Sequence, residues 1–207
     1  MTVSYTGPMA YEIADWRRQI NDLYAEIRRM DDVSKAWAHW RVTREALFRD
    51  HPMSPLSDAM RRDFGGLSAY DYDPALRFAV DLVPRSGDAI TYDLADDGVM
   101  MCRPIAKTVG LETHLGGELT AYWIEGYGGG LFLPFKDATS GDETYGGGRY
   151  IIDAIKGADL GLDGEGRLIL DFNYGYHPSC VLNARYVCPL APAENTLPVA
   201  VRGGERL

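Results

Sequence analysis

The chain has 207 residues, of which 46% are hydrophobic and 25% charged, and these fractions exclude disordered and fibrous architectures. The formal net charge is −9, with a pI of about 4.9. This acidic balance argues against nucleic acid or an anionic membrane surface as the main partner.

The N-terminus carries no basic segment followed by an apolar run, so no secretion signal is visible. The apolar stretch at 126–135 is too short and too rich in glycine for a spanning helix. Three cysteines, Cys102, Cys180 and Cys188, are too few for a disulfide framework. We therefore expect a cytoplasmic protein with no membrane partner, in which Cys180 and Cys188 alone are close enough in sequence to act together.

Two helices are predicted at the start of the chain. Within 10–30 the apolar residues recur at spacings of three and four, and the same spacing resumes over 33–48 behind Asp32 or Ser34 as N-cap. We expect a helical hairpin whose face, with Trp37 and Trp40, packs on a sheet or on the second subunit of a homodimer.

The segment 51–56 contains two prolines and is predicted to be a linker, followed by a helical turn at 58–63. Short alternating runs then predict strands at 77–83, 89–94, 99–103, 106–111, 119–125, 131–137, 149–155 and 168–173, with a last short strand near 199–201. Their spacing favours an antiparallel barrel or sandwich. The predicted fold is α+β: a helical N-terminal segment with its linker (1–63) and a β-rich body (64–207) that form one compact domain.

The loop 138–148 is rich in glycine and follows a predicted strand. A phosphate-binding loop would need a helix N-terminus after it, and a Walker loop would also need Gly-Lys-Ser/Thr. A β-branched run follows instead. The loop is therefore better interpreted as a wide hairpin whose glycines permit positive φ.

This hairpin gathers polar residues at one end of the sheet. If strand 168–173 pairs with strand 149–155, then Asp137, Arg149, Asp171 and Asn173 meet there, beneath Glu143 and Tyr145. Three interpretations stay open: an ion-pair network that pins the loop, a ligand site, and an active site.

As a ligand site, the cluster would hold a small polar or anionic molecule. Arg149 would bind the anion, and the hypothesis assigns the remaining contacts to Asp137, Thr139, Ser140, Tyr145, Asn173 and Tyr176. As an enzyme, a hydrolase or lyase, the protein would use Asp171 or Glu143 as general base and Arg149 to stabilise the anion.

His177 lies three residues before Cys180, and Cys188 follows eight residues later. A metal site or a Cys/His nucleophilic pair could use these residues. However, the spacing lacks the close cysteine pairs of structural zinc sites, and a buried cysteine usually acts as a small hydrophobic residue. We therefore expect no metal and no cofactor.

The same residues carry a resemblance to a known family. Phe64-Gly65-Gly66-Leu67, 135–150, Leu170-Asp171-Phe172-Asn173 and Cys188-Pro189-Leu190-Ala191-Pro192 resemble the family called domain of unknown function 1684 (DUF1684), over about residues 64–207. The chain departs from the family pattern at His177, where Asn is usual, and residues 1–63 stand in place of a longer β-rich head that many members of the family have. The resemblance implies a fold region and a candidate site, and it supplies no reaction. The residues that fall on the family motif are Asp137, Thr139, Ser140, Gly141, Glu143, Thr144, Tyr145, Gly148, Arg149, Asp171, Asn173, Tyr176, Pro178, Cys180 and Cys188.

Overall fold

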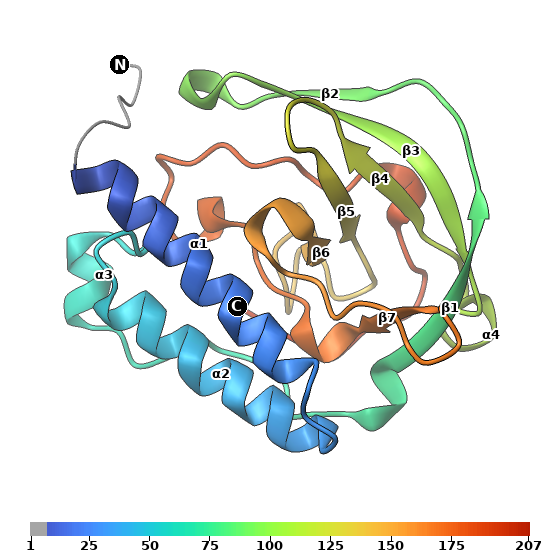
Figure 1. Ribbon diagram of the computed structural model, residues 1–207, viewed down its shortest axis with the longest axis horizontal. Helices are drawn as coiled ribbons and strands as arrows, with labels where there is room; N and C mark the ends of the chain where they lie inside the picture. Colours follow the sequence, from blue (N-terminus) through green and yellow to red (C-terminus); the bar gives the residue numbers. More distant parts are fainter. Residues whose placement is uncertain (1–7) are drawn as a thin grey trace.

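The computed structural model describes residues 8–207. Its first two helices, α1 (Pro8–Ile27) and α2 (Val33–Asp50), lie side by side next to the strands (Figure 1). They run antiparallel, because Asp15 near the start of α1 contacts His51 at the end of α2, while Glu26 near the end of α1 contacts His39. The predicted helical hairpin is confirmed.

Local chemistry sets the ends of α2. The Asp32 side chain caps its first turn by accepting a hydrogen bond from the Lys35 N–H (3.0 Å). The helix ends before His51, whose extended backbone leads into Pro52. The linker then reaches a short third helix, α3 (Asp58–Arg62), capped by Ser57.

The rest of the chain forms one antiparallel sheet of seven strands in the order β6-β5-β4-β3-β1-β7, with β2 paired to β3. The α+β class and the antiparallel barrel are confirmed. The strands are β1 (Arg77–Pro84), β2 (Ile90–Asp93), β3 (Val99–Val109), β4 (Thr120–Ile124), β5 (Gly130–Phe135), β6 (Arg149–Asp153) and β7 (Leu168–Asp171). The short helical connections are α4 (Glu112–Leu115), η1 (Pro74–Leu76), η2 (Ala95–Asp97), η3 (Ala154–Lys156), η4 (Phe172–Tyr174), η5 (Ser179–Val181) and η6 (Ala193–Asn195).

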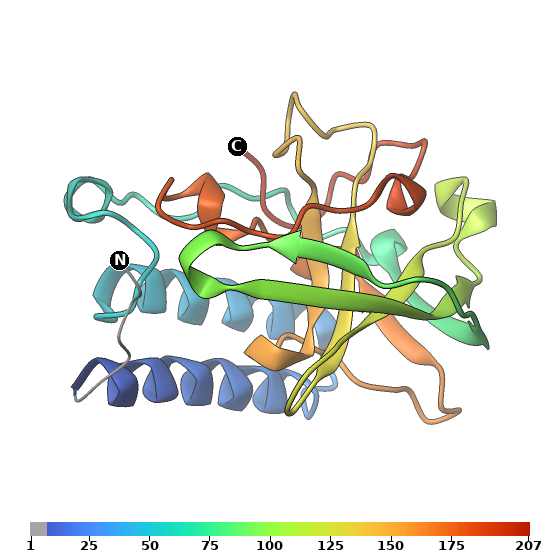
Figure 2. The same cartoon turned by 90° about the horizontal axis from the view of Figure 1, so that it is seen from above.

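The segment after β7 nearly closes the sheet into a barrel. Tyr150 of β6 and Tyr176 exchange two backbone hydrogen bonds, of 2.9 and 3.0 Å. The segment that follows β7 therefore covers the free edge of β6. The two long helices lie along one side of this barrel (Figure 2).

The predicted pairing of strand 168–173 with strand 149–155 is wrong. β7 pairs with β1 instead, with Asp171 opposite Arg77. The strand stops at Asp171 because this side chain accepts a hydrogen bond from the Asn173 N–H (3.1 Å) and caps the turn η4. The chain therefore bends before it reaches β6.

Two further strand predictions need correction. The runs 99–103 and 106–111 belong to one strand, β3, in which the register shifts between Pro104 and Ala106. A bulge at this point accommodates a proline that has no N–H for the ladder. The predicted strand at 199–201 does not form, because the Val201 N–H donates to the Asp137 carboxylate (2.7 Å) rather than to a neighbouring strand.

A buried aromatic cluster joins the helices to the barrel. Tyr24 and Trp40 from the hairpin pack on Tyr174, with the Trp40 and Tyr174 ring centroids 5.1 Å apart. Trp40 is 2% exposed and Trp37 is partly buried, so the expected shielding of the tryptophan face is confirmed, with the turn η4 after β7 rather than a strand as the contact of both residues. Within residues 8–207, no helix is both long and apolar enough to cross a bilayer.

Candidate functional site: a basic cavity between the helical hairpin and the barrel

Arg149 lies at the centre of a buried polar cluster. Its Nη2 donates to Asp137 Oδ2 (3.1 Å) and to the Val201 carbonyl (2.8 Å), and its Nη1 donates to the carbonyls of Gly203 and Glu205. The side chain is 1% exposed and its guanidinium lies over the Phe135 ring. Burial lowers the pKa of Arg149 while Asp137 opposes this shift, and the guanidinium stays charged at neutral pH.

Asp137 has further hydrogen bonds from its own loop. Oδ1 accepts from the Thr139 hydroxyl (2.6 Å) and from the Ser140 hydroxyl (3.3 Å). The loop approaches β5 so closely at Gly148, which has a φ of +95°, that a Cβ there would lie 2.5 Å from the Phe135 carbonyl oxygen. These contacts fasten the segment 201–205 to the barrel through side chains from 137–149.

Glu143 and Tyr145 lie on the same loop and point to different partners. Glu143 accepts hydrogen bonds from Arg202 (2.7 Å) and from the Tyr70 hydroxyl (3.0 Å), and these bonds lower its pKa. The Tyr145 N–H donates to His177 Nε2 (3.3 Å). Neither residue contacts Asp171.

Asp171 and Asn173 form a separate cluster next to β1. Asp171 is fully buried and pairs with Arg77 (3.2 Å), yet burial outweighs its partners and raises its pKa. The Asn173 side-chain amide donates a hydrogen bond to Asp171. It also binds the backbone of Asp73, accepting from the Asp73 N–H (2.9 Å) and donating to the Asp73 carbonyl (2.8 Å). The predicted meeting of Asp171 with Arg149 is therefore wrong, because β7 lies on β1.

Tyr176 lines a cavity of about 460 Å³ between α1, α2 and the barrel. This volume lies in the range of small-molecule sites. Most of the walls are apolar or aromatic. Besides Tyr176, the side chains that contribute these walls are Ala10, Ile13, Trp16, Ile20, Tyr24, Phe48, Met53, Pro55, Tyr150, Ala158, Pro178, Leu182 and Tyr186.

The charged side chains that line the cavity are all basic, although Glu205 and Asp153 next to the lining pair with Arg44 and Lys156. Arg17, Arg44 and Lys156 line it, and no Asp or Glu is among its lining residues within 8–207. The protein as a whole carries a net charge of −9, so a purely basic lining departs from its average surface. Such a cavity favours an anionic ligand.

Arg44 projects from the buried face of α2, and its side chain is only 10% exposed. Its Nε donates to Glu205 (2.7 Å), and its guanidinium lies over the rings of Phe48 and Tyr176. Burial acts to lower the pKa of Arg44, but Glu205 more than offsets this and the pKa is raised. Neither terminal nitrogen of Arg44, nor the Tyr176 hydroxyl, has a hydrogen-bond partner among residues 8–207.

His177 forms part of the wall as a neutral acceptor. Its Nε2 accepts from the Tyr145 N–H, and its own backbone N–H donates to Glu205 Oε2 (2.8 Å). Burial, helped by Arg149 and Arg44 and opposed by Glu205, lowers the pKa of His177 to about 4. The ring therefore adds no positive charge to the cavity at neutral pH.

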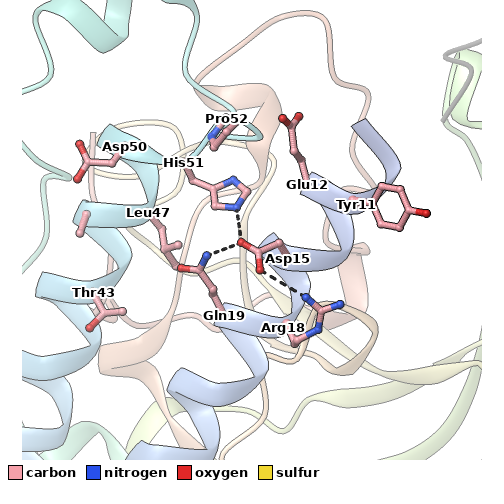
Figure 3. A pocket seen from close by; sticks show the side chains of 11 residues that line it. Tyr11, Glu12, Asp15, Arg18, Gln19, Thr43, Leu47, Asp50, His51 and Pro52 are labelled. Atoms are coloured by element: carbon pink, nitrogen blue, oxygen red, sulfur yellow. Dashed lines mark hydrogen bonds and ion pairs between the residues drawn. The ribbon is translucent and has the colours of Figure 1, made fainter. Parts of the chain in front are cut away.

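A second hollow, of about 740 Å³, lies between α1 and α2 on the outer side of the hairpin (Figure 3). Its histidine is already bound on both nitrogens: His51 Nδ1 accepts from the Met53 N–H (3.0 Å) and Nε2 faces Asp15 (3.3 Å). Asp15 is in turn held by Gln19 (2.7 Å), as Figure 3 shows. These residues brace the hairpin and leave no free polar group comparable to Arg44.

The sequence interpretation missed Arg44, Lys156 and Arg17. A signal for Arg44 was present, because it follows Trp40 by four residues and precedes Phe48 by four, which places a charged side chain on the apolar face of the helix. No comparable spacing in the sequence identified Lys156 as a site residue. Its position at the cavity depends on the turn η3 after β6, where it pairs with Asp153 (3.0 Å).

Within residues 8–207, no three His, Cys, Asp or Glu side chains gather closely enough to hold a metal ion, and this includes His177, Cys180 and Cys188. The structure thus offers no ready set of ligands around these residues.

Comparison with known proteins agrees with this architecture. The model of the family described as "Protein of unknown function (DUF1684)" matches residues 62–206. The solution structure of an uncharacterised protein from Haloarcula marismortui is similar, with a TM-score of 0.56 and 29% sequence identity over 86% of this chain and 98% of that chain. No curated protein matches the sequence.

Proposed function

We propose that this chain, which belongs to the DUF1684 family, binds a small amphipathic anion in the cavity between the helical hairpin and the barrel. The observation that carries the proposal is Arg44, a nine-tenths buried arginine whose two terminal nitrogens have no partner among residues 8–207. Both nitrogens are open to the cavity and not sealed from solvent, and a carboxylate, sulfonate or phosphate would accept hydrogen bonds from the two together.

The cavity supports this ligand class in two further ways. Arg44 is held in place by Glu205 and by the rings of Phe48 and Tyr176, so little conformational entropy is lost when an anion binds. The aromatic and aliphatic walls would bury the apolar body of the ligand. Lys156 adds a second positive charge, partly balanced by Asp153.

The site residues predicted from the sequence fall into two groups with different proposed roles. Among them Tyr176 lines the cavity, with a free hydroxyl that could donate to the ligand. Arg149, Asp137, Thr139 and Ser140 hold segment 201–205, and this places Glu205 beneath Arg44. Whether any of these residues contacts a ligand directly stays a prediction.

The test uses two fluorescent probes of similar size that differ in charge. We expect the anionic probe 8-anilinonaphthalene-1-sulfonate to bind the purified protein more tightly than neutral N-phenyl-1-naphthylamine. Equal binding of both probes, or binding of neither, would contradict an anion site.

Two variants locate the site. Arg44→Gln combined with Glu205→Gln removes the charge without leaving a buried carboxylate unpaired, and we expect it to weaken binding of the sulfonate probe by about tenfold or more. Arg49→Gln combined with Asp50→Asn is the matched control, because this exposed ion pair at the end of α2 does not line the cavity and its removal also leaves the net charge unchanged. If both double variants weakened binding equally, the loss would not be specific to Arg44.

A further inference from the structure

A row of two tyrosine rings connects two positive charges of the cavity. Lys156 Nζ lies over the Tyr150 ring, 5.8 Å from its centroid. The rings of Tyr150 and Tyr176 pack edge to face, with their centroids 5.7 Å apart. Arg44 lies over the Tyr176 ring, with Cζ 4.8 Å from its centroid. All four residues line the cavity, so one aromatic wall runs from Lys156 to Arg44.

The two charges lie at different depths. The Arg44 side chain is 10% exposed, whereas the Lys156 side chain is 56% exposed, so Lys156 marks the outer end of the aromatic wall. The turn η3, which contains Lys156, packs on α1 so closely that a Cβ at Gly157 would lie 2.4 Å from Asn21 Oδ1. Arg17, one helical turn before Asn21, is exposed and also lines the cavity. The outer end of the cavity is therefore basic, like the inner end.

Each of the two cations is held by one carboxylate of the protein and keeps donors for a ligand. Arg44 donates to Glu205 through Nε (2.7 Å), which leaves its terminal nitrogens facing the cavity. Lys156 Nζ pairs with Asp153 (3.0 Å), and an ammonium group has three N–H donors in all. A ligand with a single anionic group can use the donors of only one end.

We propose that the ligand of this cavity is a dianion whose two anionic groups stand at the two ends of an apolar chain, as in α,ω-dicarboxylates. The inner carboxylate accepts hydrogen bonds from Arg44, the outer carboxylate pairs with Lys156, and the chain lies along Tyr150 and Tyr176. This inference rests on the proposed function, because it uses the same cavity and the same arginine. It adds Lys156 as the residue that distinguishes dianions from monoanions.

The experiment measures how well three ligands of equal chain length displace 8-anilinonaphthalene-1-sulfonate from the purified protein. The ligands are decanoate, decanedioate and the monomethyl ester of decanedioate. A merely apolar cavity would prefer decanoate, because the second carboxylate makes the chain less hydrophobic. We expect decanedioate to bind about threefold or more tightly than either monoanion, a modest gain because Lys156 is exposed to water.

The same comparison is repeated with octanedioate and dodecanedioate, each beside its own monocarboxylate and half ester. The length that gives the largest preference for the dianion reports the separation of the two charges. If the monoanions displaced the probe and no dianion of the series did so better, this inference would be overturned while the anion site itself would stand. If the sulfonate probe did not bind, both proposals would fail.

A double variant tests the role of Lys156. Lys156→Gln combined with Asp153→Asn removes the outer ion pair without changing the net charge. We expect the ratio of the decanedioate affinity to the decanoate affinity to fall to one or below. The control Arg49→Gln combined with Asp50→Asn should keep the ratio of the parent, because this pair does not line the cavity.

A preference for the dianion that persists in the Lys156→Gln/Asp153→Asn variant would overturn the assignment of Lys156. Circular dichroism checks that this variant is folded. If it does not fold, the half ester decides the question without any substitution, because it keeps the chain and removes only the second charge. Equal binding of the half ester and decanedioate would then overturn the proposal.

Discussion

The Trp37 indole N–H donates to the backbone carbonyl of Asn173, 136 residues further along the chain, at 3.0 Å. This bond ties α2 to the turn that ends β7. Asn173 is fully buried, so one residue joins the helix, the strand end and the segment at Asp73. The helical hairpin is thus built into the barrel.

We therefore predict that a fragment of residues 58–207 does not fold cooperatively. Removal of both long helices would expose Tyr174, which packs on Tyr24 and Trp40 in the intact protein, and Tyr176, which lies under Arg44. Circular dichroism in the near ultraviolet and urea titration would measure this, with the full chain as reference. A sharp unfolding transition with native aromatic signals would show that the helices are dispensable for the body.

Arg149→Ala should reduce the free energy of unfolding by about 3–5 kcal/mol, because it leaves the buried Asp137 carboxylate without its counter-charge. The matched control is Arg202→Ala, which removes an exposed arginine paired with Glu143 and should cost far less stability. Urea denaturation measures both. If Arg149→Ala were as stable as the parent, the cluster would not be structural, and the ligand-site interpretation of Arg149 would gain support.

Stability should depend on pH through His177. Its pKa is 6.5 when unfolded and about 4 when folded, so below pH 6.5 the unfolded chain binds a proton that the folded chain does not. Stability from this residue is fully present above pH 6.5 and falls by up to about 3 kcal/mol as the pH drops to 4.

The variant His177→Asn should lack this contribution, and His39→Asn should retain it, because His39 is more exposed and pairs with Glu26. The quantity to measure is the difference in unfolding free energy between parent and variant at pH 4, 5, 6 and 7, which cancels the titration of the carboxylates. A difference that does not change with pH would contradict the burial of a neutral His177.

Asp171→Asn should leave stability at pH 7 unchanged within about 1 kcal/mol or raise it. Burial raises the pKa of this carboxyl group, which means that its charged form is disfavoured despite Arg77. The asparagine oxygen can still accept from Asn173, and Arg77 is partly exposed to water. The control Asp137→Asn should be markedly less stable, because Arg149 would lose its charge partner.

The variant Asp171→Asn also tests the hypothesis that the protein is a hydrolase or lyase with Asp171 or Glu143 as general base. Asp171 does not line the cavity, and Glu143 is held by Arg202 and Tyr70. We expect that any turnover detected in the parent survives Asp171→Asn. Its complete loss in a stably folded Asp171→Asn would establish Asp171 as the general base.

Sequence periodicity predicted the helices well, because the spacing of Ile20, Tyr24 and Ile27 directly encodes the face that a helix buries. Alternation likewise located most of the strands, although it divided β3 in two and predicted a strand at 199–201 that does not form. It does not encode which strands pair, and so β7 was placed on β6 rather than on β1. The pairing depends on the cap at Asp171, whose effect on strand length cannot be seen in a local pattern.

The candidate site was less predictable. The polar residues around the glycine-rich loop were found because they stand together in sequence. Their partners Val201, Gly203 and Glu205 are backbone acceptors, which no side-chain pattern identifies. The cavity also needed three-dimensional information, since Arg44, Lys156 and Tyr176 come from three distant segments.

The bridge between Tyr150 and Tyr176 also bears on self-association. It occupies the outer edge of β6, and the contact of Ile169 with the Gly161 carbonyl (3.0 Å) does the same for β7. A strand from another molecule therefore has no open row of backbone donors and acceptors at these two ends of the sheet, which hinders growth into larger aggregates. A homodimer of this protein would have to associate through side-chain surfaces rather than by extending the sheet across β6 or β7.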